Sequence, residues 1–338
     1  MSTIYEIAKI AGFSPTTVSK VINNYPDISE KTRAKIKKIL EEENFLPNSQ
    51  AQFLSTKKTW TLGIVYFEDL GVGLTHPFFS GVIGAFKNQA DKHGYSLLFG
   101  SKNDRLKNDT FLEYFKYRCV DGIAVICTNP KDKETLELIE SDFPIVVIDM
   151  SNKNISSVSS DNLKGCYLAI NYLYNLGHRK IAHITGTSDL DNWANSIRQS
   201  GYIKEMKKLN LEVKDEYIVD GINFDVSGGY EAMKKLLALK DRPTAVFAAC
   251  DKIAIGAINA IKDEGLSVPE DISIIGFDDI EIAQYLTPRL TTIRQNCNLI
   301  GNTAADLLVE QINKKTKLTI NKIIPVEFIE RDSCRKIE

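Results

Sequence analysis

Short apolar segments alternate with helical segments from Leu62 to Phe277, and this alternation constrains the fold more than any other feature. Continuous apolar strands separated by helices are typical of parallel sheets that helices cover on both faces. The alternation restarts near residue 158, which predicts two similar lobes with a ligand site between them, beyond the carboxyl ends of the strands. The predicted strands are residues 62–67, 95–99, 122–127, 144–149, 158–160, 181–185, 217–219, 245–248 and 272–277.

Two short amphipathic segments joined by a glycine-containing turn open the chain. The first is Thr3–Ile10, and the second, SPTTVSKVINN, is Ser14–Asn24. A serine and a proline at the start of the second segment suit a helix N-terminus, and its apolar residues form one stripe. Taken alone, this segment also fits a solvated amphipathic helix. With the first segment and a third predicted helix from Ser29, it has the plan of a helix-turn-helix, whose second helix lies in the major groove.

Composition and charge describe a globular chain with a basic N-terminal part. Hydrophobic residues make up 43% of the 338 residues and charged residues 25%. Residues 1–60 carry a net charge of +3 and the remainder −5, which suits a nucleic-acid-binding module on a larger body. No run of 18 apolar residues and no secretory signal pattern is present, so we expect a cytoplasmic protein. The six cysteines are scattered without metal-ligand spacing, and we expect reduced thiols, no metal and no cofactor.

Residues 49–55, read SQAQFLS, are too few to form a stable helix alone. One interpretation is a disordered linker. The other is a segment that folds only on DNA, with Leu54 as an apolar wedge in the minor groove.

The chain resembles the lactose-repressor (LacI/GalR) family of bacterial transcription regulators almost from end to end. The motifs that carry the resemblance are IYEIAKIAGFSPTTVSKVINN, FLPNSQAQFL, LGHRKIAHITG, IIGFDD and TPRLTTIRQ. The resemblance implies a homodimer on a near-palindromic operator, a hinge helix, and a periplasmic-binding-protein-like core whose chain crosses three times between two lobes. The implied domains are residues 1–47 (helix-turn-helix), 48–60 (hinge helix and linker) and 61–338 (core), with lobe 1 at about 61–160 and 292–320 and lobe 2 at about 161–291 and 321–338.

The resemblance also implies which residues contact DNA. Lys20 stands where arginine is usual and can reach the same guanine acceptors as a point charge. Gln52 stands where arginine is common in the hinge, which weakens the expected electrostatic contact. The base-reading positions are Pro15, Thr16 and Lys20; the DNA-backbone positions are Tyr5, Ser14, Thr17, Ser19, Asn23, Thr32 and Asn48; the minor-groove positions are Ala51 and Leu54.

A third set of residues matches positions that hold the small-molecule effector in the family. Carboxylates that accept from hydroxyl groups, an arginine fork and aromatic faces suit a sugar. For single residues, helix capping, an ion pair or core packing are the alternatives. The set is His76, Phe78, Asp149, Asp161, Trp193, Arg198, Phe224, Asp251 and Asp278.

The resemblance predicts a repressor of carbohydrate-utilisation genes that a sugar effector releases from its operator. A regulator of the same family that needs a corepressor, such as a purine, or a phosphocarrier protein is the alternative. An enzyme is more remote, because the sequence contains no nucleophile elbow, P-loop or H-E-x-x-H motif. An exported sugar-binding protein is also more remote, because residues 1–55 have the helix-turn-helix plan and no secretory signal pattern is present.

Overall fold

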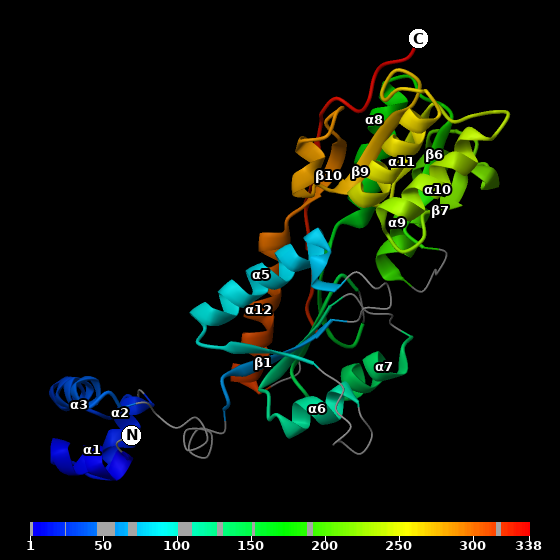
Figure 1. Ribbon diagram of the computed structural model, residues 1–338. Coiled ribbons are helices and arrows are strands. Elements are labelled where there is room, and N and C mark those ends of the chain that lie inside the picture. The colour runs from blue at the N-terminus through cyan, green and yellow to red at the C-terminus, as the bar shows by residue number, and fades with distance from the viewer. Residues whose placement is uncertain are drawn as a thin grey trace. The chain divides into compact units, whose positions relative to one another are not determined.

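The computed structural model shows a chain of helices and strands that forms two compact units (Figure 1). One unit comprises residues 1–61 with 119–121, and the other comprises residues 62–118 and 122–338. The described residues are 3–23, 25–45, 58–66, 73–100, 110–126, 131–150, 153–187, 192–315 and 319–338. Residues 46–57 lie outside this description, and they include the predicted boundary at residue 47 and most of the predicted hinge and linker, residues 48–60.

Three capped helices form the first unit, as the local sequence signals predict. Thr3 and Glu6 form a capping box at the first helix, and Gly12 ends it with a φ of 75°, a left-handed conformation that glycine adopts without strain. Six buried apolar side chains from the three helices form the core: Ile7, Ala8, Ala11, Val18, Val21 and Ile36. The helices are α1 (Ile4–Ala11), α2 (Pro15–Ile22) and α3 (Glu30–Glu42).

The first lobe of the second unit is a six-stranded sheet in the order β11-β5-β4-β3-β1-β2. The pairings of β1 with β3, β3 with β4, β4 with β5 and β5 with β11 are parallel. Figure 1 shows α5 and α12 on one side of this sheet and α6 and α7 on the other. The elements are β1 (Thr61–Tyr66), η1 (Gly73–Thr75), α5 (Pro77–Lys92), β2 (Ser96–Phe99), α6 (Phe111–Tyr117), β3 (Gly122–Ile126), α7 (Lys133–Glu140), β4 (Ile145–Ile148), β5 (Ser156–Ser160), α12 (Cys297–Lys314) and β11 (Asn321–Ile324).

The second lobe is another six-stranded sheet, in the order β12-β10-β9-β8-β6-β7. Its described pairings are parallel except that of β10 with β12. Separate apolar clusters lie on its two faces, one with α8 and α9 and the other with α10 and α11. The elements are α8 (Asn162–Asn175), β6 (Ile181–Thr185), α9 (Trp193–Lys208), η2 (Asp215–Tyr217), β7 (Ile218–Asp220), α10 (Val226–Leu237), β8 (Ala245–Ala248), α11 (Asp251–Asp263), β9 (Ser273–Asp278), η3 (Glu281–Gln284), β10 (Thr291–Gln295) and β12 (Val326–Ile329).

The chain crosses between the two sheets three times, and two of the predicted crossings are wrong by a few residues. Strand β5 ends at Ser160, where the first crossing is expected. Residues 292–295 were expected in lobe 1, yet β10 pairs with β9 of the second sheet. Residues 321–324 were expected in lobe 2, yet β11 pairs with β5 of the first. A short strand joins the sheet in which its pairing partner lies, and that partner can be far away in the sequence. The local pattern of apolar residues does not reveal this partner.

A carboxylate holds the chain where it enters the core. The Asp121 side chain accepts hydrogen bonds from the backbone amides of Thr59 and Trp60, at 2.9 and 2.8 Å. The Thr59 hydroxyl donates to the carbonyl of Cys119 at 2.8 Å. These contacts fix the start of β1 beside the loop before β3. In the described part of the chain, no helix combines the length and apolar character needed to cross a membrane.

Candidate functional site

The outward face of α2 carries the three predicted base-reading residues. Val18 and Val21 of this helix are buried, whereas Thr16 is exposed and Pro15 and Lys20 are partly exposed. Pro15 is the first helical residue, so its missing N–H removes no helical hydrogen bond. The face therefore offers one hydroxyl, one cation and one apolar ring to a partner.

The predicted DNA-backbone positions within the described ranges gather around the ends of the three helices. Ser14 caps α2 by accepting from the Thr17 amide at 3.1 Å. Asn23 donates to the Ser19 carbonyl at 3.0 Å at the other end of this helix. Thr32 lies in the first turn of α3, and 73% of Tyr5 is exposed on α1. The predictions for Asn48, Ala51 and Leu54 lie outside the described residues.

Lys20 forms an ion pair with Asp27, which lies in the loop after α2. The hydrogen bond from Lys20, together with its positive charge, lowers the pKa of Asp27. Two backbone contacts fix this loop: the Tyr25 amide donates to the Lys20 carbonyl at 2.9 Å, and Arg33 donates to the Tyr25 carbonyl at 2.7 Å. Asp27 therefore holds the only predicted base-reading cation of α2, and any DNA ligand must compete with it.

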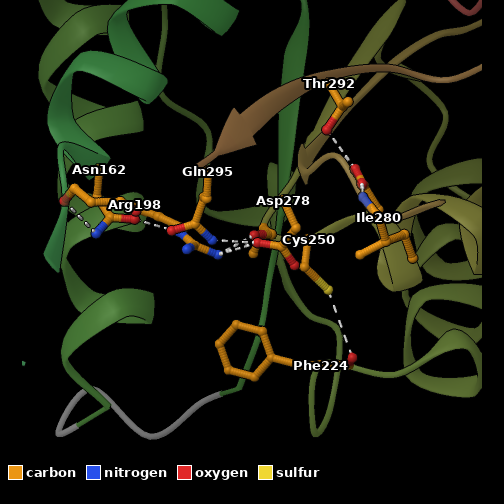
Figure 2. Close-up of polar contacts among 12 residues, drawn as sticks. Asn162, Arg198, Phe224, Cys250, Asp278, Ile280, Thr292 and Gln295 are labelled. Atoms are coloured by element: carbon orange, nitrogen blue, oxygen red, sulfur yellow. Dashed lines mark hydrogen bonds and ion pairs between the residues drawn. The ribbon is translucent and has the colours of Figure 1, made fainter. Parts of the chain in front are cut away.

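The second unit contains a buried polar cluster around Arg198 of α9 (Figure 2). Arg198 is only 3% exposed. Its Nε donates to Asn162 Oδ1 at 2.8 Å, and its Nη1 donates to the carbonyl of Ala249 at 2.7 Å. Its guanidinium carbon lies 3.9 Å from the centre of the Phe277 ring, a cation–π contact. These contacts fix the plane of the guanidinium, and its Nη1 lies 3.9 Å from Asp278 Oδ1.

Asp278 ends strand β9, and the carboxylate oxygen that faces Arg198 also accepts a hydrogen bond from Gln295. Gln295 Nε2 donates to Asp278 Oδ1 at 2.6 Å. Burial raises the pKa of Asp278, and the positive charge of Arg198 opposes this rise. A carboxylate that is bound on one oxygen, beside a fixed guanidinium, forms a combined acceptor and donor site for a polar ligand.

Asp149 is a second carboxylate that the positive charge of Arg198 influences. It follows β4 of the first sheet, and its Oδ1 is buried without a hydrogen-bond partner among the described residues. Burial raises the pKa of Asp149 from 3.8 to about 6, and Arg198 again opposes the rise. Asp149, Phe224 and Asp278 all have a positive φ, at 58°, 52° and 113°. Such strain in non-glycine residues is typical of functional sites.

Phe224 lies in the loop before α10, and Figure 2 shows it in the same view as Arg198 and Asp278. Three consecutive non-glycine residues, Ile222–Phe224, adopt a positive φ. The Phe224 amide donates to the Gly186 carbonyl at 2.9 Å, and the ring lies so close to Gly186 that a Cβ there would overlap it. Asn195 Oδ1 accepts from the Gly186 amide at 2.7 Å. The ring is therefore positioned by contacts that only glycine at 186 permits.

Four buried polar atoms near the carboxyl ends of strands lack hydrogen-bond partners within the described ranges. Because such atoms are normally satisfied in folded proteins, they point to a polar ligand or to bound water. His76, at the start of α5, is 6% exposed, and burial lowers its pKa to about 4, so its ring is neutral at physiological pH. The atoms are His76 Nδ1, Asp149 Oδ1, Ser160 Oγ and Gln295 Oε1.

Three predicted effector residues make contacts within the protein. Asp251 is fully buried, and its two oxygens accept from the Thr292 hydroxyl at 2.5 Å and the Ile280 amide at 2.8 Å. Phe78 is 4% exposed and packs in the core of the first lobe. Asp161 caps α8 by accepting from the Lys164 amide at 2.9 Å. Helix capping, internal hydrogen bonds and core packing, the alternatives that the sequence left open, are therefore present at these three residues. Trp193 is partly exposed at the start of α9.

Asn162, Asn195 and Gln295 are polar residues of this site that sequence reasoning missed. Asn162 binds Arg198 across 36 residues of chain, and Gln295 binds Asp278 across 17. Gln295 ends the TPRLTTIRQ motif that carries part of the family resemblance, and that position was the available signal. Within the described ranges, no group of three His, Cys, Asp or Glu side chains is arranged to hold a metal ion.

Two protein families match this chain in separate regions. Residues 3–48 match the bacterial regulatory proteins of the lacI family, and residues 148–334 match the periplasmic binding protein-like domain. Among curated proteins, the "Probable HTH-type transcriptional repressor ExuR" of Bacillus subtilis (strain 168) is 37% identical over 100% of this chain and 99% of its own length. The "HTH-type transcriptional repressor PurR" of Mannheimia succiniciproducens is 36% identical over the full length of both chains.

Solved structures agree with this assignment. The lac repressor dimer bound to operator and the anti-inducer ONPF has a TM-score of 0.84 and 28% identity, with 99% of each chain covered. The complex of the transcriptional regulator CelR with cellobiose has a TM-score of 0.74 and 26% identity, covering 98% of this chain and 100% of that one. The helix-turn-helix unit, the two-sheet core and the full-length relatives lead to one conclusion: this chain belongs to the lacI family of bacterial regulatory proteins.

Proposed function

We propose that the protein is a cytoplasmic transcriptional repressor that leaves its operator when a sugar binds the Arg198 cluster. This name denotes Arg198 with Asn162, Asp149, Asp278 and Gln295. The observation that carries the proposal is the set of unpartnered buried polar atoms beside a fixed arginine, in a chain that also contains a helix-turn-helix. Carboxylate and amide oxygens accept from hydroxyl groups, and the phenyl ring of Phe224 suits a sugar's C–H face.

A purine corepressor is the second candidate effector. The relatives named PurR, at 36% identity, favour it, and Phe224 would stack equally well on a flat base. The two effectors differ in the sign of their effect, because a corepressor tightens operator binding and an inducer weakens it. Neither candidate requires a catalytic step.

We expect a homodimer in which each α2 reads one half of a near-palindromic operator. The neighbouring lac repressor structure is a dimer on operator DNA, which supports this arrangement. In our proposal, Lys20 and Thr16 read base edges, and Leu54 enters the minor groove at the centre of the site. Effector binding changes the relation between the lobes, the hinge loses its DNA-bound conformation, and linkage requires that operator weaken effector binding by the same factor.

A thermal-shift screen followed by operator release tests this function. The panel is cellobiose, ribose, galactose, glucose 6-phosphate and hypoxanthine, and the operator is a duplex selected from a randomised library. We expect one sugar to raise the melting temperature and to weaken operator binding. A purine that tightens operator binding would favour the second candidate. Conversion of any sugar to a new product would contradict both.

Replacing Asp27 by asparagine should raise the affinity for a random duplex several-fold and so reduce sequence selectivity. The substitution releases the Lys20 ammonium, which can then reach phosphates on any sequence. Filter binding at several salt concentrations measures the effect, with a steeper salt dependence expected. Glu42→Gln is the matched control, because it removes one negative charge from the Lys38–Glu42 pair without touching Lys20. Equal changes in the two variants would show that only net charge matters.

Replacing Gly186 by alanine should weaken effector binding at least tenfold and leave operator binding unchanged. The added Cβ overlaps the Phe224 ring and forces it out of its position. Isothermal titration with the active panel compound measures the loss. Gly84→Ala in α5 is the control, because a Cβ there meets nothing within 4 Å. Wild-type affinity in the Gly186 variant would remove Phe224 from the site.

A further inference from the structure

The carboxylate of Asp279, the residue after Asp278, binds two arginines, one from β10 and one that follows β12. Asp279 Oδ2 accepts from Arg294 Nε at 2.7 Å, and its Oδ1 lies 2.7 Å from Arg331 Nη2. Its side chain is only 7% exposed. Arg331 also donates to the Leu290 carbonyl at 2.8 Å, so the carboxylate is tied to a fixed backbone.

The backbone at this point needs external support. Asp278 has a φ of 113° and Asp279 a φ of 56°, two successive conformations that side-chain-bearing residues rarely adopt. The Ile280 amide donates to the buried Asp251 at 2.8 Å directly after them. The end of β9 is therefore clamped from both sides, and the side chain of Asp279 provides one of the clamps.

The partners of Asp279 lie beside two of the three crossings between the lobes. Arg294 is the residue before Gln295, which binds Asp278 and ends β10 just before the chain crosses to α12. Arg294 also reaches Glu327 at 3.4 Å, in the strand that follows the crossing from β11. Two successive residues of β10 thus bind Asp278, the last residue of β9, and Asp279, which follows it. Asp278 belongs to the Arg198 cluster, and Asp279 does not.

We propose that Asp279 is a positioning residue that couples the effector site to the crossings between the lobes; this role rests on the proposed function. Asp279 does not touch the effector. It holds Asp278 in its strained conformation and, through Arg294, fixes the relation of β9 to the two crossing strands. An effector that binds Asp278 therefore acts on a strand end that is ionically linked to both crossings, and the displacement is transmitted to the first lobe.

The test compares operator release in the full-length protein and in Asp279→Asn, with whichever of cellobiose, ribose or hypoxanthine most raises the wild-type melting temperature as the probe. Operator affinity without probe should stay within about twofold of wild type, whereas the change in operator affinity caused by saturating probe should fall at least fivefold. Asp241→Asn is the matched control, because Asp241 also bridges two cations, Lys180 and Lys214, in the same lobe. It should respond like wild type.

A second pair of variants separates this role from simple stabilisation. Arg294 is 46% exposed, so Arg294→Gln should fold even if Asp279→Asn does not. Arg294→Gln should lose the response, and Arg294→Lys, which keeps the charge, should recover part of it. Wild-type release in Asp279→Asn or Arg294→Gln would overturn the role of Asp279 alone. A wild-type protein whose operator affinity no probe changes would overturn the proposed function, and this role with it.

Discussion

Replacing Arg198 by alanine should abolish the response to effector and destabilise the core by roughly 3 kcal/mol. The guanidinium donates to Asn162 and Ala249, stacks on Phe277 and faces Asp278, and alanine replaces none of these contacts. Loss of a buried, hydrogen-bonded charge from a binding site costs about 2–5 kcal/mol, so effector affinity should fall at least about 30-fold. Isothermal titration and chemical denaturation measure the two effects.

Operator binding by this variant should remain, because the helix-turn-helix is a separate compact unit. Arg242→Ala, at an exposed position before β8, is the matched control and should change neither property. An Arg198→Ala protein that still releases operator at the wild-type effector concentration would remove Arg198 from the site.

Replacing Asp149 by asparagine should stabilise the protein at pH 8 by up to about 3 kcal/mol and at the same time weaken effector binding. The pKa of Asp149 rises from 3.8 in the unfolded chain to about 6 in the fold, because the carboxyl group is buried. Between these values the folded state keeps a proton that the unfolded state loses. The contribution of Asp149 to stability is therefore complete below pH 3.8 and is lost as the pH rises through about 6.

Urea denaturation of both proteins between pH 4 and pH 8 measures this effect. Because burial also raises the pKa of Asp278 and Asp251, wild-type stability falls over a similar range, and only the difference between the two proteins reports on Asp149. The difference should grow from pH 4 to about pH 6 and then stay constant. A difference that does not vary with pH would show that Asp149 is ionised in the fold.

Local signals predicted the helix-turn-helix most accurately. The capping serines, Pro15 and Gly12 act within a few residues of the helix ends that they define, so a short window of sequence contains the whole cause. Strands β1 to β9 also lie within a few residues of their predicted positions, because apolar runs between helices reflect burial on two faces. Strands β10, β11 and β12 were not among the predicted strands. The long helix α12 was not among the predicted elements, although it packs against α5 across the first lobe.

Long-range pairing limited the remaining predictions. The sheet to which β10 or β11 belongs depends on partners more than a dozen residues away, and the local pattern of each strand fits either sheet. The same limit applies to the site. Arg198, Asp149 and Asp278 follow strand ends or match family motifs, whereas Asn162 and Gln295 gain their roles only from the partners that the fold brings to them. Asp251 matches a family motif as well, but in the fold its carboxylate accepts hydrogen bonds from Thr292 and Ile280. The sequence did not indicate these two partners.

The most direct test of the account is a titration of the full-length protein with a selected duplex and a scrambled one, with and without the compound that raises its melting temperature. We expect tight binding to the selected duplex only, weakened at least tenfold by a sugar, and an equal weakening of sugar binding by that duplex. Equal affinity for both duplexes under every condition would contradict the claim that a ligand-sensing core controls a DNA-reading head.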